Sequence, residues 1–205
     1  MLTDKYISSS VSINNNSVYV NGYTIFKSGS TDISGFLLSV YQHFQLSYPK
    51  FYKMDNLSKL GWLTSELLLN KFSKDDYQPE DIGIVLANAS SSLDNDLKYI
   101  GTIKDIPSPS VFVYTLPNIV IGEICIRNNF KGEHAFFVQD KFNPDFIYQQ
   151  VDYLLDNNIL QAAVCGWVEI LEQDYKAVLY LVEKKKSEQS ILFSAENMNN
   201  IFLQG

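Results

Sequence analysis

Two cysteines and two histidines are the residues of this chain whose chemistry is most often catalytic. Cys125 lies in the middle of an expected helix, and Cys165 lies within an apolar run. Free cysteines in such settings pack as small hydrophobic residues, so we interpret both as core residues rather than as nucleophiles or a disulfide. His43 and His134 are far apart and have no metal-binding spacing around them, so we expect no metal site and no cofactor.

Two polar runs also carry reactive groups. Ser90-Ser91-Ser92 lacks the Gly-x-Ser-x-Gly pattern of a nucleophile elbow and has no histidine nearby, so we interpret it as a turn that starts a helix. Lys184-Lys185-Lys186 ends an expected strand. A solvated strand end explains this run, and docking of an acidic partner protein is the alternative.

Composition and net charge indicate which classes of protein this chain can belong to. The chain has 205 residues, of which 46% are hydrophobic and 19% charged, which is typical of a globular protein with a sizeable core. A net charge of −7 argues against binding nucleic acid, which requires a basic surface. We find no apolar run long enough for a membrane helix and no signal-peptide pattern, so we expect a cytoplasmic protein without a membrane span.

The elements that must position these residues follow from hydrophobic periodicity. Residues 6–26 are predicted to form a β-hairpin that turns at Asn14-Asn15-Asn16. Further strands are predicted at 81–87, 135–138, 162–168 and 177–182. Helices are predicted at 34–46, 56–72, from about 93, 117–127 and 144–157. Asp55 and Asn143 are the expected N-caps of two of these helices, and Pro117 and Pro144 suit a first helical turn.

The order of these elements predicts the fold class. Strands alternate with helices and end in a tight connection at Glu172-Gln173-Asp174, which predicts α/β architecture with a mostly parallel sheet and one antiparallel pair. We find no internal repeat and no linker, so residues 1–205 are expected to form a single domain. The polar tail, residues 187–205, is expected to be loosely held.

Three segments resemble the N-terminal half of the β-ketoacyl synthases, which have the thiolase fold. The first is Lys53 to Lys59, which opens a long helix, and the second is the strand from Asp81 to Leu86 with the polar turn after it. The third and most specific runs from Tyr114 to Arg127 and ends in Lys131-Gly132. The resemblance covers residues 50–183. It implies half of a thiolase-type fold, a five-stranded mixed sheet with helices on both faces.

The resemblance also implies a position for the family's catalytic cysteine. That position is nine residues after Gly132 and 25 residues before Gly166, which we align with the glycine that ends the next strand. Both anchors give Lys141, flanked by Asp140 and Phe142. A lysine that fills a vacated site, paired with Asp140 or Asp145, is the interpretation that we favour over a Schiff-base lysine.

The catalytic histidines of the family lie in its second half, beyond the end of this chain, so we expect neither nucleophile nor histidines here. The helix at 144–157 also differs from its counterpart in the family, because Tyr148, Gln149, Gln150, Asp152, Tyr153 and Asp156 lie opposite its apolar stripe. We expect that polar face to meet water or a polar partner.

Family dimers pair through the strand that corresponds to Ala135-Phe136-Phe137-Val138-Gln139, so we expect this strand to be the dimer edge. The first functional hypothesis is a non-catalytic, chain-length-factor-like partner of a full-length β-ketoacyl synthase in type II fatty-acid or polyene synthesis. The second is a stand-alone homodimer that binds acyl chains or an acyl carrier protein, for which Lys184–Lys186 is a docking candidate. The third is an enzyme that uses another nucleophile.

Overall fold

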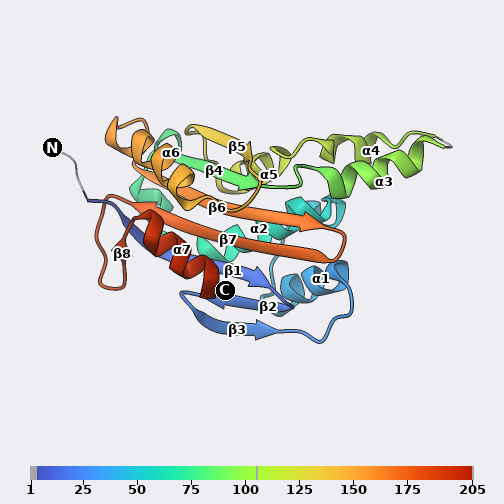
Figure 1. Cartoon of the computed structure of the whole chain (residues 1–205), viewed down its shortest axis with the longest axis horizontal. Helices are drawn as coiled ribbons and strands as arrows, with labels where there is room; N and C mark the ends of the chain where they lie inside the picture. Colours follow the sequence, from blue (N-terminus) through green and yellow to red (C-terminus); the bar gives the residue numbers. More distant parts are fainter. Residues whose placement is uncertain (1–3, 105, 205) are drawn as a thin grey trace.

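The computed structural model describes residues 4–104 and 106–204, which form one mixed sheet with helices on both faces (Figure 1). The strands are β1 (Tyr6–Asn14), β2 (Ser17–Val20), β3 (Tyr23–Lys27), β4 (Ile82–Asn88), β5 (His134–Val138), β6 (Ala162–Leu171), β7 (Asp174–Glu183) and β8 (Ile191–Leu192). The helices are α1 (Ile33–His43), α2 (Asn56–Leu68), α3 (Leu93–Ile103), α4 (Pro109–Phe112), α5 (Ile119–Asn128), α6 (Pro144–Asp156) and α7 (Ala195–Gln204). The α/β class is therefore confirmed.

The sheet has eight strands rather than the five that we expected. Its order is β3-β2-β1-β7-β6-β4-β5, and β8 pairs with the start of β1. β4 runs parallel to both β5 and β6, whereas β6 and β7 form the predicted antiparallel pair. Parallel β4 has a buried residue at every position, as expected for a strand covered on both faces.

The N-terminal hairpin prediction was incomplete. Asn15 and Asn16 adopt the left-handed conformation at the predicted turn, with φ of 45° and 55°. A second turn with positive φ at Asn21 and Gly22 then adds β3, so this region is a three-stranded meander. An Asn-Gly pair is the strongest short hairpin signal, since both central residues of the turn need positive φ.

The two faces of the sheet have separate cores. Ile84 and Leu86 of β4 face α1, α2 and α5, whereas Val85 and Ala87 face α6 and α7. This alternation follows directly from the two-residue period of a strand. The helices on each face meet the sheet through apolar side chains that are almost fully buried.

Local signals explain where the helices start. The Asp55 carboxylate accepts a hydrogen bond from the Ser58 N–H, and the Asn143 side chain accepts one from the Phe146 N–H, so both predicted N-caps are confirmed. Pro117 precedes the helix instead of starting it, because α5 begins at Ile119.

Two other sequence predictions were wrong. Gly166 lies in the middle of β6 instead of ending the strand, and it is required there by its positive φ of 146° and by the carbonyl oxygen of Val178, which would lie 2.1 Å from a Cβ atom. The tail is ordered: it forms β8 and α7, with Phe193 and Met198 buried against the sheet.

No single helix among the described residues is long and apolar enough to cross a membrane. The segments Pro109–Thr115 and Ile119–Asn128 pass a test of length and composition together, but they are bent by 97°. Val120, Ile121 and Ile124 of α5 are buried in the core against α2.

Candidate functional site

The strand predicted as a dimer edge lies at the edge of the sheet. β5 pairs with β4 on one side and is the last strand in the sheet order. Its residues are less buried than those of β4: Ala135, Phe136 and Phe137 are half-buried, and Val138 is 57% exposed. An unprotected edge of this kind can accept another strand.

The hydrogen-bond register shows which main-chain groups of β5 face outward. The Ile84 N–H donates to the Glu133 oxygen at 3.1 Å, and the Gln139 N–H donates to the Asn88 oxygen at 2.9 Å. Alternate residues of a parallel strand direct both main-chain groups to the same neighbour. The odd-numbered residues of β5 therefore face β4, and the N–H and C=O groups of His134, Phe136 and Val138 point away from the sheet.

Side chains fix this edge in place. Phe136 packs against the core on the α5 side, and Phe137 meets Phe146 of α6 with ring centroids 4.8 Å apart. A groove of about 300 Å³ runs between β5 and α6, lined by residues that include Ala135, Phe137 and Tyr153. The edge strand is thus held by side-chain packing and bordered by a groove that could accept side chains from another molecule.

The loop between β5 and α6 holds the three residues that the resemblance placed at the nucleophile position. Asp140 and Lys141 are exposed, whereas Phe142 is buried. The described residues include no ion pair between Lys141 and either Asp140 or Asp145. An amine nucleophile needs a desolvated setting, which an exposed lysine does not have.

Phe142 closes the space behind this loop. Its ring stacks on Phe202 of α7 with centroids 4.1 Å apart and an interplanar angle of 15°, and it also contacts Trp167 and Tyr180. The N-terminus of α6 is meanwhile capped by Asn143. The space behind the loop is filled by the chain's own aromatic residues, and α7 supplies one of them.

Both cysteines pack with the core, as the sequence predicts: Cys165 is buried, and Cys125 is half-buried against it. Burial raises the pKa of the Cys125 thiol to about 11. Burial also raises the pKa of Cys165, which lies on β6 under α6 and α7. Thiols with such pKa values are protonated near neutral pH and are poor nucleophiles.

The serine run is a turn, as predicted. Ser91 has a φ of 52°, and the side chain of Asn88 bonds to both main-chain groups of Ser91. The N–H groups of Ala89 and Ser90 both donate to the Glu169 carboxylate. The main-chain donors of this loop are therefore already paired within the chain.

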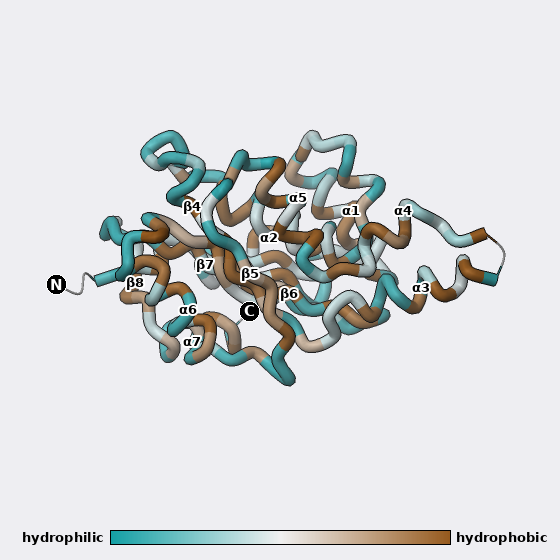
Figure 2. The backbone as a smooth tube through the Cα atoms, turned by 90° about the horizontal axis from the view of Figure 1, so that it is seen from above, coloured by the Kyte–Doolittle hydropathy of each residue, from teal (hydrophilic) through white to brown (hydrophobic). Residues whose placement is uncertain are grey.

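An apolar arm was missed by the sequence analysis. α3 and α4 extend away from the sheet, and Figure 2 shows apolar stretches along them. We call residues 93–116 the arm. Its large apolar side chains that are at least 42% exposed are Leu93, Leu97, Ile100, Ile103, Ile106, Phe112, Val113 and Leu116. Ordered contacts hold the arm, such as a hydrogen bond of 2.9 Å from the Asn95 amide to the Val111 oxygen. Apolar side chains left exposed on an ordered element are candidates for contact with another molecule.

The polar face of α6 is only partly open to water: Gln149 and Tyr153 are exposed, as we expected, whereas other parts of the face are covered by the chain itself. Lys5, whose side chain is only 6% exposed, forms ion pairs of 2.5 Å with Asp152 and Asp156. Tyr148 packs on Phe193, with centroids 5.1 Å apart. Tyr153 remains exposed at 62%. The N-terminal strand and the tail therefore cover much of the face that we expected to be open.

The lysine run at 184–186 contacts neighbouring side chains. Lys184 donates to the Asn158 side chain, and Lys186 lies over the Tyr6 ring at 5.6 Å, so these two members of the lysine run are tied to the surface. Among residues 4–104 and 106–204, no three His, Cys, Asp or Glu side chains come together in a group that could hold a metal ion.

The fold is similar to solved ketosynthase structures. The ishigamide ketosynthase/chain length factor matches with a TM-score of 0.63 at 16% identity, over 91% of this chain and 63% of that chain. A type II polyketide acyl carrier protein in complex with its ketosynthase bound to the hexaketide matches with a TM-score of 0.61 at 14% identity, over 89% and 63%. A ketosynthase in complex with its chain length factor from Xenorhabdus doucetiae matches with a TM-score of 0.57 at 12% identity, over 91% and 81%.

These likenesses establish the fold, half of a thiolase-type fold, and the chain spans 63% of the length of the first two solved chains. No family model matches the sequence, and a search of the curated proteins also finds no match.

Proposed function

We propose that this chain is a non-catalytic, ketosynthase-like subunit that pairs along β5 with an intact β-ketoacyl synthase in type II fatty-acid or polyene synthesis. The observation that carries the proposal is the open edge of β5, where His134, Phe136 and Val138 direct their main-chain groups outward. An antiparallel strand from a partner would satisfy these groups and extend the sheet across the interface.

The loop after β5 supports the absence of catalysis. The chain has two cysteines, and neither lies between β5 and α6, where the resemblance places the nucleophile. Lys141 occupies that position on the surface, and Phe142 fills the space behind it. Acyl transfer to a thiolate at a helix N-terminus therefore has no group to start from in this segment.

The position of the arm also supports a partner at the β5 edge. β4 and β5 are parallel, so their carboxyl ends lie at the same end of the sheet. The arm leaves the sheet from the end of β4, and the Lys141 loop leaves it from the end of β5. A partner strand on β5 would place the second subunit beside both. The surface of that subunit would then bury apolar side chains such as Leu97 and Ile100, and this burial would stabilise the complex.

The solved structures support the type of partner. Of the three structures described above, two are named as a ketosynthase with a chain length factor, and one as a ketosynthase with its acyl carrier protein. In such an assembly this chain would stabilise the synthase and shape its acyl tunnel. The exposed part of the Lys184–Lys186 run is the candidate contact for an acidic carrier protein.

A second candidate is a homodimer that binds acyl chains or a carrier protein without a synthase. The position of α7 favours this candidate, because α7 packs beside α6 on the same face of the sheet and buries Met198 there. A chain that closes this face itself has less need of a different subunit, and two copies could pair through the same β5 edge.

Co-expression separates the two candidates. The tagged chain would be co-expressed with a full-length β-ketoacyl synthase from the same genome, purified through the tag, and analysed by size exclusion with light scattering and by thermal melting. We expect a one-to-one complex that melts at a higher temperature than either protein alone. A homodimer that does not bind the synthase, with no shift in melting temperature, would contradict the first candidate and favour the homodimeric binding protein.

A further inference from the structure

A cleft of about 570 Å³ lies on the α7 side of the sheet, over the outer strands β1, β2 and β3. It exists because one edge of β1 has two short neighbours: β8 pairs at Tyr6 and Ile7, and β2 pairs from Val11 onward. α7 is anchored over β7, where the Tyr180 hydroxyl donates to the Met198 oxygen at 2.7 Å. The helix therefore forms a wall of the cleft and leaves the outer strands uncovered.

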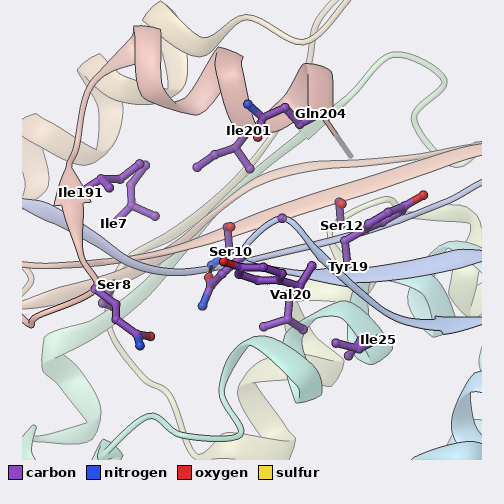
Figure 3. A pocket seen from close by; sticks show the side chains of 14 residues that line it. Ile7, Ser8, Ser10, Ser12, Tyr19, Val20, Ile25, Ile191, Ile201 and Gln204 are labelled. Carbon is purple, nitrogen blue, oxygen red and sulfur yellow. Dashed lines mark hydrogen bonds between the residues drawn. The ribbon is translucent and has the colours of Figure 1, made fainter.

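Two serines on the floor of this cleft have hydroxyl groups without partners. Ser10 and Ser12 are only 5% and 4% exposed, and their side chains point from β1 toward the side where Ile201 and Gln204 of α7 lie (Figure 3). Among the described residues, neither hydroxyl takes part in a hydrogen bond, whereas the neighbouring Ser8 hydroxyl donates to the Leu181 oxygen. Neither oxygen is among the fully buried side-chain atoms that lack a partner, so both hydroxyls open into the cleft and are available to bond to a ligand there.

The rest of the lining defines the chemistry of that ligand. None of the residues that line the cleft carries a charge. Tyr19 and Tyr23 bring aromatic rings with hydroxyl groups, and Gln189 and Gln204 bring amides, which both donate and accept hydrogen bonds. Aliphatic side chains, such as that of Ile201, complete the walls.

We propose that this cleft binds a neutral sugar. A sugar hydroxyl both donates and accepts, which matches the serine, tyrosine and amide groups of the lining, and the C–H face of a sugar ring packs on aromatic and aliphatic side chains. A charged ligand would be desolvated without an opposite charge to compensate. An alkyl chain would leave the Ser10 and Ser12 hydroxyls buried without partners, which costs free energy.

This site does not rest on the proposed function. It uses β1 to β3 and the tail, whereas the proposed pairing edge is β5, at the opposite end of the sheet order. A failure of one therefore leaves the other standing.

The test measures sugar binding to the full chain by saturation-transfer NMR and thermal melting, with maltose, cellobiose and lactose as neutral probes. Glucosamine and glucuronate serve as charged probes. We expect at least one neutral disaccharide to bind with millimolar affinity or better, and the charged probes to bind at least tenfold more weakly. Ser10→Ala and Ser12→Ala should each weaken binding about fivefold, since each removes one hydrogen bond.

Ser9→Ala is the matched control, because Ser9 lies on the same strand but does not line the cleft. It should leave the affinity unchanged, and the melting temperatures of all three variants without sugar should show that they fold. Three results would overturn the proposal: no saturable binding of any neutral probe, equal binding of the charged probes, or full affinity in the Ser10→Ala/Ser12→Ala double variant.

Discussion

Two regions of this molecule differ in how well the chain covers them: the sheet face under α6 and α7, and the β5 edge with the arm. On the α6 side, the chain covers its own surface: Phe202 of the tail stacks on Phe142, and Lys5 neutralises two aspartates of α6. At the β5 edge, by contrast, the main-chain groups of alternate residues face outward, and the arm leaves leucine and isoleucine side chains at least 42% exposed. The difference teaches where a partner belongs, because apolar surface and free main-chain groups both gain from association.

The largest expected effect concerns the closed side. Phe142→Ala should lower the free energy of unfolding by about 3 kcal/mol, since it leaves a cavity under α7 and removes the stacking partner of Phe202. Urea denaturation measures this. Tyr153→Ala on α6 is the control, because that side chain is exposed and should cost less than about 0.5 kcal/mol. Equal effects of the two changes would show that α7 does not seal this side.

The open edge gives the next effect. Val138→Pro should weaken association with the partner about a hundredfold, because it removes an outward donor and bends the edge. The stability of the isolated chain should change little, since the Val138 N–H lies outside the ladder with β4. Val138→Thr keeps the donor and serves as control in analytical ultracentrifugation. If the complex of Val138→Pro were as tight as that of Val138→Thr, the interface would lie elsewhere.

The arm should contribute less per residue. Ile100→Asp places a charge on the apolar stripe of α3 and should weaken the same complex about tenfold while leaving the melting temperature of the isolated chain nearly unchanged, since Ile100 is 58% exposed. Lys104→Gln, on the same arm, is the control and should have little effect. A drop in the melting temperature of Ile100→Asp alone would mean that the stripe packs within the chain rather than on a partner.

The smallest effect is chemical. Because burial raises the pKa of Cys125 to about 11, the folded chain holds this proton more tightly than the unfolded chain does. Its alkylation by iodoacetamide should therefore be slow at pH 8 and rise about tenfold per pH unit up to about pH 10.

Mass spectrometry should also find no acyl adduct after incubation with an acylated carrier protein. A stable adduct on Lys141, Cys125 or Cys165 would contradict the non-catalytic reading.

Periodicity and caps predicted much of the fold because they are local signals. Asp55 and Asn143 mark helix starts through a hydrogen bond within one turn, and the alternation in β4 separates the two cores. The third strand of the meander had a local signal in Asn21-Gly22 that we did not use. The tail had a weaker one, since Met198, Ile201 and Phe202 share a face of α7.

Other features depend on tertiary structure. The sequence places Leu93, Leu97 and Ile100 on one face of a helix, but periodicity does not tell whether that face is covered. Only the arrangement of α3 beyond the sheet leaves this face exposed. Lys5 and Asp152 are likewise 147 residues apart, so their pairing follows from the sheet order rather than from local sequence.

The most direct test of the open edge is residue-resolved amide hydrogen exchange by NMR, with and without the synthase. In the isolated chain, the amides of His134, Phe136 and Val138 should exchange quickly, while those of Ala135 and Phe137, which face β4, are already protected. Addition of the synthase should slow the three outward amides by at least about tenfold. Unchanged exchange at these three amides in a complex that demonstrably forms would contradict pairing through β5.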